Sequence, residues 1–191
     1  MSLAPEAGNE GLRSSLGKGM SDAGFLERVD MLMEAGIPNL KLYFMMGLPG
    51  EDDGDARAIV DLLSRVRERM LSVGRPRGKV GNLTASVNPF VPKPQTAFER
   101  VPMAAEGDLK RRLKIVREGA FSLGGVQAQA GSVRAAYLDG LLSLGGRTVF
   151  NVLDKLPPGG VSLKRLTGIF PPAEKILFDR EEGDLPWGCI K

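Results

Sequence analysis

The sequence predicts an α/β protein built around a parallel β-sheet. Segments with apolar residues at helical spacing alternate along the chain with short apolar runs of strand length. The clearest run covers residues 39–46 (NLKLYFMM), which are bounded by Pro38 and Gly47 and lie between two expected helices. A compact apolar run in that position is typical of a buried strand in a parallel sheet.

The first third of the chain contains two expected helices before this strand. Residues 9–19 predict a short helix or turn that is interrupted by glycine. A clearer helix begins after Ser21, because serine is a good N-cap and apolar residues follow it at helical spacing. Gly36 ends that helix as a C-terminal glycine.

The strongest helix prediction follows the strand. Asp52, Asp53 and Asp55 stand where carboxylates stabilise a helix N-terminus, and Gly74 marks the end. One apolar stripe runs between these points. It consists of Ile59, Leu62, Leu63, Val66, Met70 and Val73.

The second half repeats the alternation of strand and helix. Residues 82–90 predict a second strand, which ends in a proline-rich loop, and residues 126–130 predict a third. Between them, a helix over 105–123 turns Leu109, Leu113, Val116 and Ala120 inward. Residues 132–156 are expected to be helical, the run 157–160 (PPGG) breaks the pattern, and 161–191 form a short helix and an irregular tail.

Composition excludes several catalytic classes. The 191 residues contain no His and one Cys. A Ser-His-Asp triad, an HExxH zinc helix and a cysteine-ligated metal site within this chain are therefore excluded. The content of 42% hydrophobic and 26% charged residues fits one soluble domain, or one domain with a small appendage.

Charge, hydropathy and cysteine content bear on partners and location. The net charge of +3 is too mild to indicate a nucleic-acid partner by itself. No apolar run approaches the roughly 18 residues of a membrane span, and residues 1–20 do not resemble a signal peptide. With a single Cys, this pattern leads us to expect a cytoplasmic protein without a membrane partner.

The order of helices and strands predicts where ligands bind. Right-handed crossovers place the helices on one face of a parallel sheet, and ligands bind at the carboxyl ends of the strands. Those ends are the loops Gly47–Glu51 and Asn88–Thr96. Leu3–Asn9 resembles the end of another strand, and its Glu6 is either a ligand-binding carboxylate or a helix-start acid.

The Gly47–Glu51 loop (GLPGE) allows two interpretations. Its glycines permit a ligand to approach the backbone closely, and amides at the next helix start could receive an anion or a hydroxyl. The acidic residues around it repel phosphate, so an adenosine-like or cationic ligand suits it better. The alternative is a tight strand-to-helix turn whose acids complement the helix dipole.

The proline-rich loop and the basic residues are also ambiguous. Asn88 could bind a ligand and Phe90 could stack on one, or the loop could be a rigid surface segment that packs on the next helix. The stretches 65–79 and 110–117 are rich in Arg and Lys. They indicate either solvated helix faces or contacts with RNA.

Taken together, three segments resemble the radical S-adenosylmethionine (SAM) enzymes. They are APEAGNEGLR with the following GKG, KLYFMMGLPGEDD, and SVNPFVPKPQTAFE, and SVRAAYLDGLLSLGGR and the C-terminal LPW are also similar. The nearest resemblance is to the iron–sulfur oxidoreductases that carry a cobalamin-binding-like region, whose relatives include tRNA methylthiotransferases. The resemblance covers most of the chain.

The resemblance implies a partial (β/α) barrel, of which residues 1–131 supply the later half. Residues 132–191 would form a mainly helical extension. Leu3–Gly8 would end the fourth barrel strand, Leu40–Met46 would be the fifth and Leu83–Asn88 the sixth.

The resemblance also assigns residues to the SAM site. Glu6 and Asn9 match the loop that binds the ribose and methionine portions, and Arg13 is a candidate partner for the methionine carboxylate. The loop after the fifth strand would support the adenine, although Tyr43 replaces the first glycine of the family's motif and Glu51 falls one residue late. The implied cofactor-binding residues are Glu6, Asn9, Arg13, Met45, Gly47, Leu48, Pro49, Gly50, Glu51, Val87, Asn88 and Phe90.

One departure from the family pattern defines what this chain could do. The family binds a 4Fe-4S cluster through a CxxxCxxC motif, and the cluster cleaves SAM to a 5′-deoxyadenosyl radical. This sequence has no such motif; its one cysteine, Cys189, is expected to be structural or incidental. We therefore expect a piece of a larger radical SAM oxidoreductase that is inactive alone, binds SAM weakly and needs its missing N-terminal half; cobalamin is a further candidate cofactor.

Two alternative functions remain open, and one further partner is expected. The parent protein could be a tRNA-modifying relative of the methylthiotransferase type, or the chain could be a non-catalytic interaction module. An uncovered edge strand and an exposed barrel-facing side of the sheet favour pairing with a second copy of the chain.

Overall fold

The computed structural model describes residues 1–154, 164 and 173–179. The break at 157–160, most of the tail, the LPW segment and Cys189 lie outside these residues. The described chain divides into two compact units. The first contains residues 1–88 and 107–131, and the second contains 89–106 and the described residues from 132 onward.

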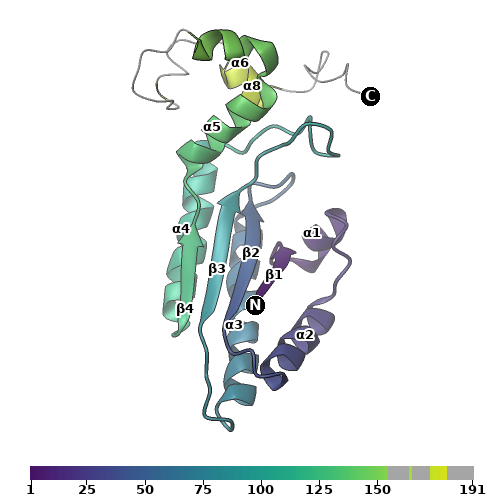
Figure 1. The fold of residues 1–191 in the computed structure, drawn as a ribbon, viewed down its shortest axis with the longest axis vertical. Coiled ribbons are helices and arrows are strands. Elements are labelled where there is room, and N and C mark those ends of the chain that lie inside the picture. Colours follow the sequence, from purple (N-terminus) through teal and green to yellow (C-terminus); the bar gives the residue numbers. More distant parts are fainter. Residues whose placement is uncertain (155–163, 165–172, 180–191) are drawn as a thin grey trace. The chain divides into compact units, whose positions relative to one another are not determined.

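A four-stranded sheet forms the centre of the first unit (Figure 1). Its order follows the sequence: β1 (Ser2–Glu6), β2 (Leu40–Met46), β3 (Leu83–Pro89) and β4 (Val126–Ala130). β1 runs parallel to β2, and β3 runs parallel to β4. The α/β class and the three strands expected within 39–46, 82–90 and 126–130 are confirmed.

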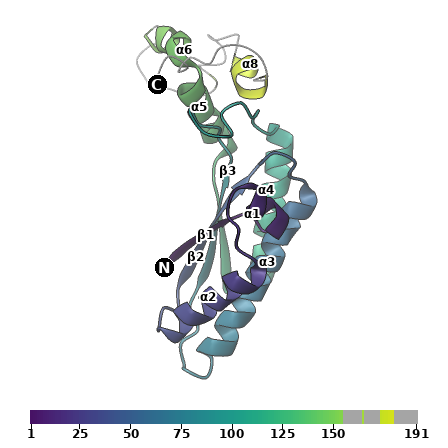
Figure 2. The same cartoon turned by 90° about the vertical axis from the view of Figure 1, so that its right-hand side faces the viewer.

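The helices of this unit lie on one face of the sheet, as Figure 2 shows. They are α2 (Asp22–Glu34), α3 (Asp53–Gly74) and α4 (Glu106–Ser122), while the short α1 (Glu10–Ser15) follows β1. The core is formed by alternate strand residues, such as Leu42 and Phe44 of β2, together with the apolar stripes of the helices. The inward residues expected for the helix over 105–123 are all buried in α4.

The ends of the helices follow the expected capping chemistry. The Ser21 side chain accepts a hydrogen bond from the Gly24 amide, and Gly36 adopts φ +81° just after α2. At α3, Asp52 and Asp55 form a reciprocal capping box. These boundaries were predictable because the signals are local in sequence.

The opposite face of the sheet is open within this unit. Along β2 the buried residues alternate with Lys41, Tyr43 and Met45, which are half-buried or exposed. A parallel sheet normally has both faces covered. Here no helix among the described residues of this unit covers the second face (Figures 1 and 2).

The second unit joins the proline-rich segment to α5 (Val133–Leu144), α6 (Gly146–Leu153) and α8 (Ala173–Phe178). The Met103 amide donates to the Leu177 carbonyl at 2.8 Å, and the Tyr137 hydroxyl donates to Ala104 O at 2.8 Å. The expected division at residue 131 placed 89–106 with the sheet. In the structure this segment belongs to the helical unit because its backbone and side chains pack there.

Within the described residues, no helix has the length and apolar character needed to cross a membrane.

Candidate functional site

Three loops of the first unit meet the carboxyl ends of neighbouring parallel strands. They are residues 7–9 after β1, Gly47–Glu51 after β2, and Asn88 near the end of β3. In parallel α/β sheets this edge is where ligands bind. The structure thus brings the loops that the sequence singled out in this unit to one edge, although their side chains differ in what they contact.

Glu6, the last residue of β1, has an unusual backbone conformation. Its φ is +69°, a left-handed conformation that only a few per cent of residues other than glycine adopt. The register of β1 against β2 shifts between Leu3 and Glu6, and the Glu6 carboxylate lies 3.4 Å from the Lys18 ammonium. Strain of this kind concentrates at binding and active sites, so Glu6 is the strongest candidate site residue.

Glu51 turns back onto its own loop. Its side chain is 7% exposed, and Oε2 accepts hydrogen bonds from the amides of Gly47 and Leu48, the latter at 2.8 Å. Burial raises the pKa of Glu51, and the two backbone hydrogen bonds and the charge of Arg112 oppose this rise only in part. Glu51 therefore shapes the loop; the amides that it occupies are not available to an adenine or an anion.

The start of α3 is satisfied from within as well. Asp52 accepts hydrogen bonds from the amides of Gly54 at 2.6 Å and Asp55 at 3.1 Å, while Asp55 accepts from the Asp52 amide at 3.0 Å. The geometry thus favours the alternative of a tight, internally capped turn. Leu48 is buried, and only Pro49 and Gly50 project from the loop as exposed residues.

Arg13 does not match the role that the resemblance implies. It is 1% exposed, and its guanidinium donates to the carbonyls of Ala7 and Gly8 at 3.2 and 2.8 Å and pairs with Asp22. Burial raises the pKa of Asp22, but its bonds to Arg13 and Arg65 outweigh that effect and hold the pKa below its ordinary value. Arg13 therefore fixes the loop after β1 and leaves no free fork for a substrate carboxylate.

Asn9 likewise serves the fold first. Its Oδ1 accepts hydrogen bonds from the amides of Gly11 at 2.7 Å and Leu12 at 3.2 Å, which makes it the N-cap of α1. Gly8, beside it, packs so closely on α3 that a Cβ there would overlap the backbone of Ile59. The loop after β1 is thus held by its cap, its arginine and a close glycine contact.

The remaining predicted residues separate into two groups. Met45 and Asn88 stand on the open face near the strand ends, half-buried and exposed respectively. Val87 is buried and its carbonyl accepts from the Gly131 amide at 2.8 Å, so that backbone group is occupied. Phe90 belongs to the second unit, where it is 7% exposed and packs edge-to-face on Phe98 at 5.9 Å; it is not a free stacking platform.

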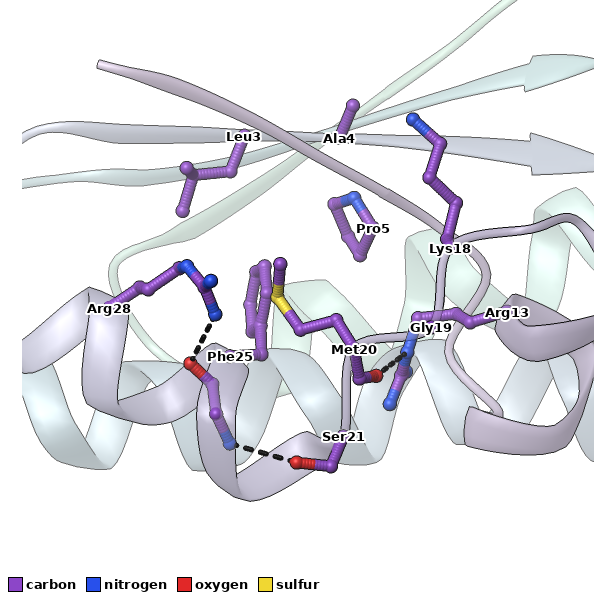
Figure 3. A pocket seen from close by; sticks show the side chains of 11 residues that line it. Leu3, Ala4, Pro5, Arg13, Lys18, Gly19, Met20, Ser21, Phe25 and Arg28 are labelled. Carbon is purple, nitrogen blue, oxygen red and sulfur yellow. Dashed lines mark hydrogen bonds between the residues drawn. The ribbon is translucent and has the colours of Figure 1, made fainter.

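A pocket beside β1 had no signal in the sequence. It has a volume of about 400 Å³ and lies between the edge strand and α2 (Figure 3). Leu3 and Pro5 of β1 face Phe25 and Arg28 of α2 across it, and the connector between α1 and α2 closes one side. No local motif predicts it, because it arises from the spacing between elements.

The basic stretches are largely engaged within the protein. Arg65 pairs with Asp22, Arg69 with Asp30, and Arg67 donates to the carbonyls of Gly81 and Gly124. On α4, Arg111 and Arg112 both pair with Asp53. These contacts favour the interpretation as solvated helix faces over an RNA-binding surface.

Among the residues that the structure describes, no group of three or more His, Cys, Asp or Glu side chains could hold a metal ion. The described residues therefore offer no ligand set for an iron–sulfur cluster.

Comparison with known proteins identifies one archaeal relative. The chain is 30% identical over 156 residues to a protein of Methanocaldococcus jannaschii named "Uncharacterized protein MJ0966". The match covers 81% of this chain but 32% of the archaeal protein, so the chain spans about a third of the relative's length. No family model matches the chain, and no solved structure matches it.

Proposed function

We propose that this chain is the later half of a radical SAM barrel and carries part of the SAM-binding side of a larger oxidoreductase. The observation that carries the proposal is the parallel sheet of the first unit, with helices on one face and an open, mainly polar second face. A partial (β/α) barrel has this arrangement, because its inner face lines the ligand cavity. The strained Glu6 stands at the carboxyl edge, where the ligand would bind.

The residues at this edge fit a nucleoside-containing ligand in part. The Glu6 carboxylate can accept hydrogen bonds from ribose hydroxyls, and the exposed Asn88 amide can both donate and accept at a base edge. Met45 adds an apolar contact beside them. Three other residues assigned to the site from the sequence hold its loops in place instead: Asn9, Arg13 and Glu51.

The residues that the structure describes offer no ligand set for the cluster, and the chain contains a single cysteine. Ligands for a 4Fe-4S cluster would come from another part of the parent protein, and the greater length of the archaeal relative is compatible with such a part. When bound, SAM and the cluster supply the radical. This chain's contribution is to bind and orient the nucleoside.

The complete open reading frame provides the first test. We expect it to encode a CxxxCxxC motif upstream of this chain, and we expect the reconstituted full-length protein to form 5′-deoxyadenosine from SAM when reduced. Glu6→Gln should lower that rate without changing the iron content, whereas Glu118→Gln on the exposed side of α4 should not. A complete reading frame that lacks the cysteines would overturn the proposal and leave the non-catalytic interaction module.

The isolated chain provides a second test. Under the proposal, the cluster that would hold the methionine end of SAM is bound by another part of the parent protein. Calorimetry on the 191-residue chain should therefore show SAM binding no tighter than the micromolar range. Sub-micromolar SAM binding by the 191-residue chain would contradict the proposal that it supplies only part of the SAM site.

A further inference from the structure

The open face of the sheet is mainly polar. Ser2 pairs in register with Lys41, and Thr84 pairs with Gln127. These four polar residues, one from each strand, line the same hollow. Ser86 and Gln129 form the next such pair. Barrels whose interior is a packed core fill these layers with bulky Val, Ile and Leu. A polar lining is instead what a water-filled or ligand-filled interior requires.

The amino-terminal end of this face contains a hollow of about 330 Å³. The strands contribute Ser2, Lys41, Thr84 and Gln127, and Asn39 and Asn82 add amides beside them. Lys41 is the one charged side chain among the described residues that line it, and no carboxylate lines it. Met1 also lines the hollow, and its N-terminal ammonium donates to Asn39 O at 3.0 Å. The hollow therefore combines two ammonium groups with hydroxyl and amide donors, which is the chemistry that binds a carboxylate or a phosphate.

Tyr43 helps to keep the lysine on this face. The Lys41 ammonium lies 5.0 Å from the centroid of the Tyr43 ring, two residues along the same strand. A cation over an aromatic face is attracted by the ring's quadrupole. Lys41 is thus held over the sheet, and an ion there can still approach the ammonium from the side away from the ring.

We infer that this hollow binds the anionic end of an elongated, polar small-molecule substrate. One part of this inference rests on the proposed function: the other end of the substrate would reach the SAM site at the carboxyl ends of the strands. Lys41 and Met45 are four residues apart on β2, which corresponds to about 13 Å at roughly 3.3 Å per residue. The substrate class is therefore an elongated molecule with a carboxylate or phosphate at one end, and Lys41 is a specificity-determining residue.

Binding of the anionic end can be measured on the 191-residue chain by NMR. Inorganic phosphate and, separately, acetate are titrated at constant ionic strength, and the backbone amide resonances of Lys41, Thr84 and Gln127 are followed. We expect saturable shifts at these residues. Tighter binding of phosphate assigns a phosphate end to the substrate, and tighter binding of acetate assigns a carboxylate end.

Two variants and a control decide whether Lys41 is responsible. Lys41→Gln should weaken binding at least about fivefold, and Gln127→Glu should weaken it further by placing a carboxylate in the hollow. Lys114→Gln removes one exposed lysine from α4 and should leave binding unchanged. If Lys41→Gln does not fold, Gln127→Glu still tests the inference. Equal shifts in the wild type and both hollow variants would overturn the inference.

The outcome is separable from that of the proposed function. If anion binding depends on Lys41 but the parent protein does not cleave SAM, the anion site remains. The spacing of about 13 Å between that site and a SAM site then no longer applies. SAM cleavage without any shift at the hollow removes the anion site and retains the proposed function.

Discussion

Glu6 was singled out from the sequence as a candidate site residue, and in the structure its backbone is strained. The strain can be tested by comparing glycine and alanine at this position. For a residue other than glycine, the left-handed region costs about 1–2 kcal/mol. Glycine has no such cost there, although it loses about 0.5–1 kcal/mol more backbone entropy on folding. We therefore expect Glu6→Gly to be more stable than Glu6→Ala by about 1 kcal/mol, by urea denaturation.

A matched pair on α2 provides the control. Glu27 is exposed on this helix, where glycine is worse than alanine by about 1 kcal/mol. The order of the Gly and Ala variants should therefore reverse between positions 27 and 6. Under the proposed function, both Glu6 variants should also lower SAM-dependent activity in the parent protein, so that the more stable glycine variant would still be less active than the wild type. The same order at both positions would show that Glu6 is not strained.

Glu51 gives a pH-dependent prediction. Burial raises its pKa above the ordinary 4.5, so the folded state binds a proton more tightly than the unfolded state does. Lowering the pH from neutrality toward 4.5 should therefore stabilise the wild type relative to Glu51→Gln, which cannot titrate. Denaturant titrations of both proteins at several pH values measure the difference, and a difference independent of pH would contradict it.

Replacing Glu51 by alanine tests its hydrogen bonds rather than its charge. The amides of Gly47 and Leu48 lie in buried residues and would lose their acceptor. A buried donor left without a partner costs about 1–3 kcal/mol. We expect Glu51→Ala to lose about 3 kcal/mol and Glu51→Gln, which keeps an acceptor oxygen, to lose clearly less.

The same residues show how far sequence reasoning reaches at this scale. Glu6, Asn9, Arg13 and Glu51 were all singled out from the sequence, but three of them bind their own loops. Their partners are backbone groups that the fold brings near, such as the carbonyls of Ala7 and Gly8 around Arg13. A motif specifies the residue type, whereas folding decides whether its donors face a ligand or the protein.

At the scale of the elements, α4 packs closely on α3 at one glycine. A Cβ on Gly119 would lie 2.6 and 2.7 Å from the two methyl carbons of Val60, whereas a Cβ on Gly107 would meet nothing within 4 Å. Both glycines lie in the same helix, where alanine is favoured by about 1 kcal/mol. Gly107→Ala should therefore stabilise the protein by up to that amount, whereas Gly119→Ala should destabilise it.

Thermal unfolding of the two variants measures this contrast. The midpoint should rise for Gly107→Ala and fall for Gly119→Ala, and the double variant Gly119→Ala/Val60→Ala should show a weaker penalty from the glycine change because the methyl groups are gone. A rise for both single variants would show that the two helices are less closely packed than Gly119 indicates.

The elements themselves were predictable because their signals are local. The apolar run over β2, the acids before α3 and the glycines after α2 and within the loops all act within a few residues. The grouping of residues 89–106 with α5 and α8 was not predictable, since it depends on contacts such as Met103 to Leu177, far apart in sequence. The pocket between β1 and α2 was missed for the same reason.

At the scale of the whole molecule, the sheet has edges at β1 and β4 and a mainly polar open face. Strand edges expose backbone groups that can pair with another strand. A polar face provides little hydrophobic driving force for association, so we expect edge pairing through β1 to dominate over face-to-face contact. The pocket beside β1 adds apolar surface from Leu3, Pro5 and Phe25 next to this edge.

We therefore expect the 191-residue chain to self-associate through β1, with a mass by light scattering that rises with concentration toward that of a dimer. Ala4 is exposed on β1, and a lysine there blunts the edge by charge repulsion between copies. Ala4→Lys should shift the association to at least about tenfold higher concentration, about 1.4 kcal/mol. Ser122→Lys adds the same charge at an exposed position of α4 and should not. A monomer at all concentrations would contradict the edge argument, and equal effects of both lysines would assign the association to net charge instead.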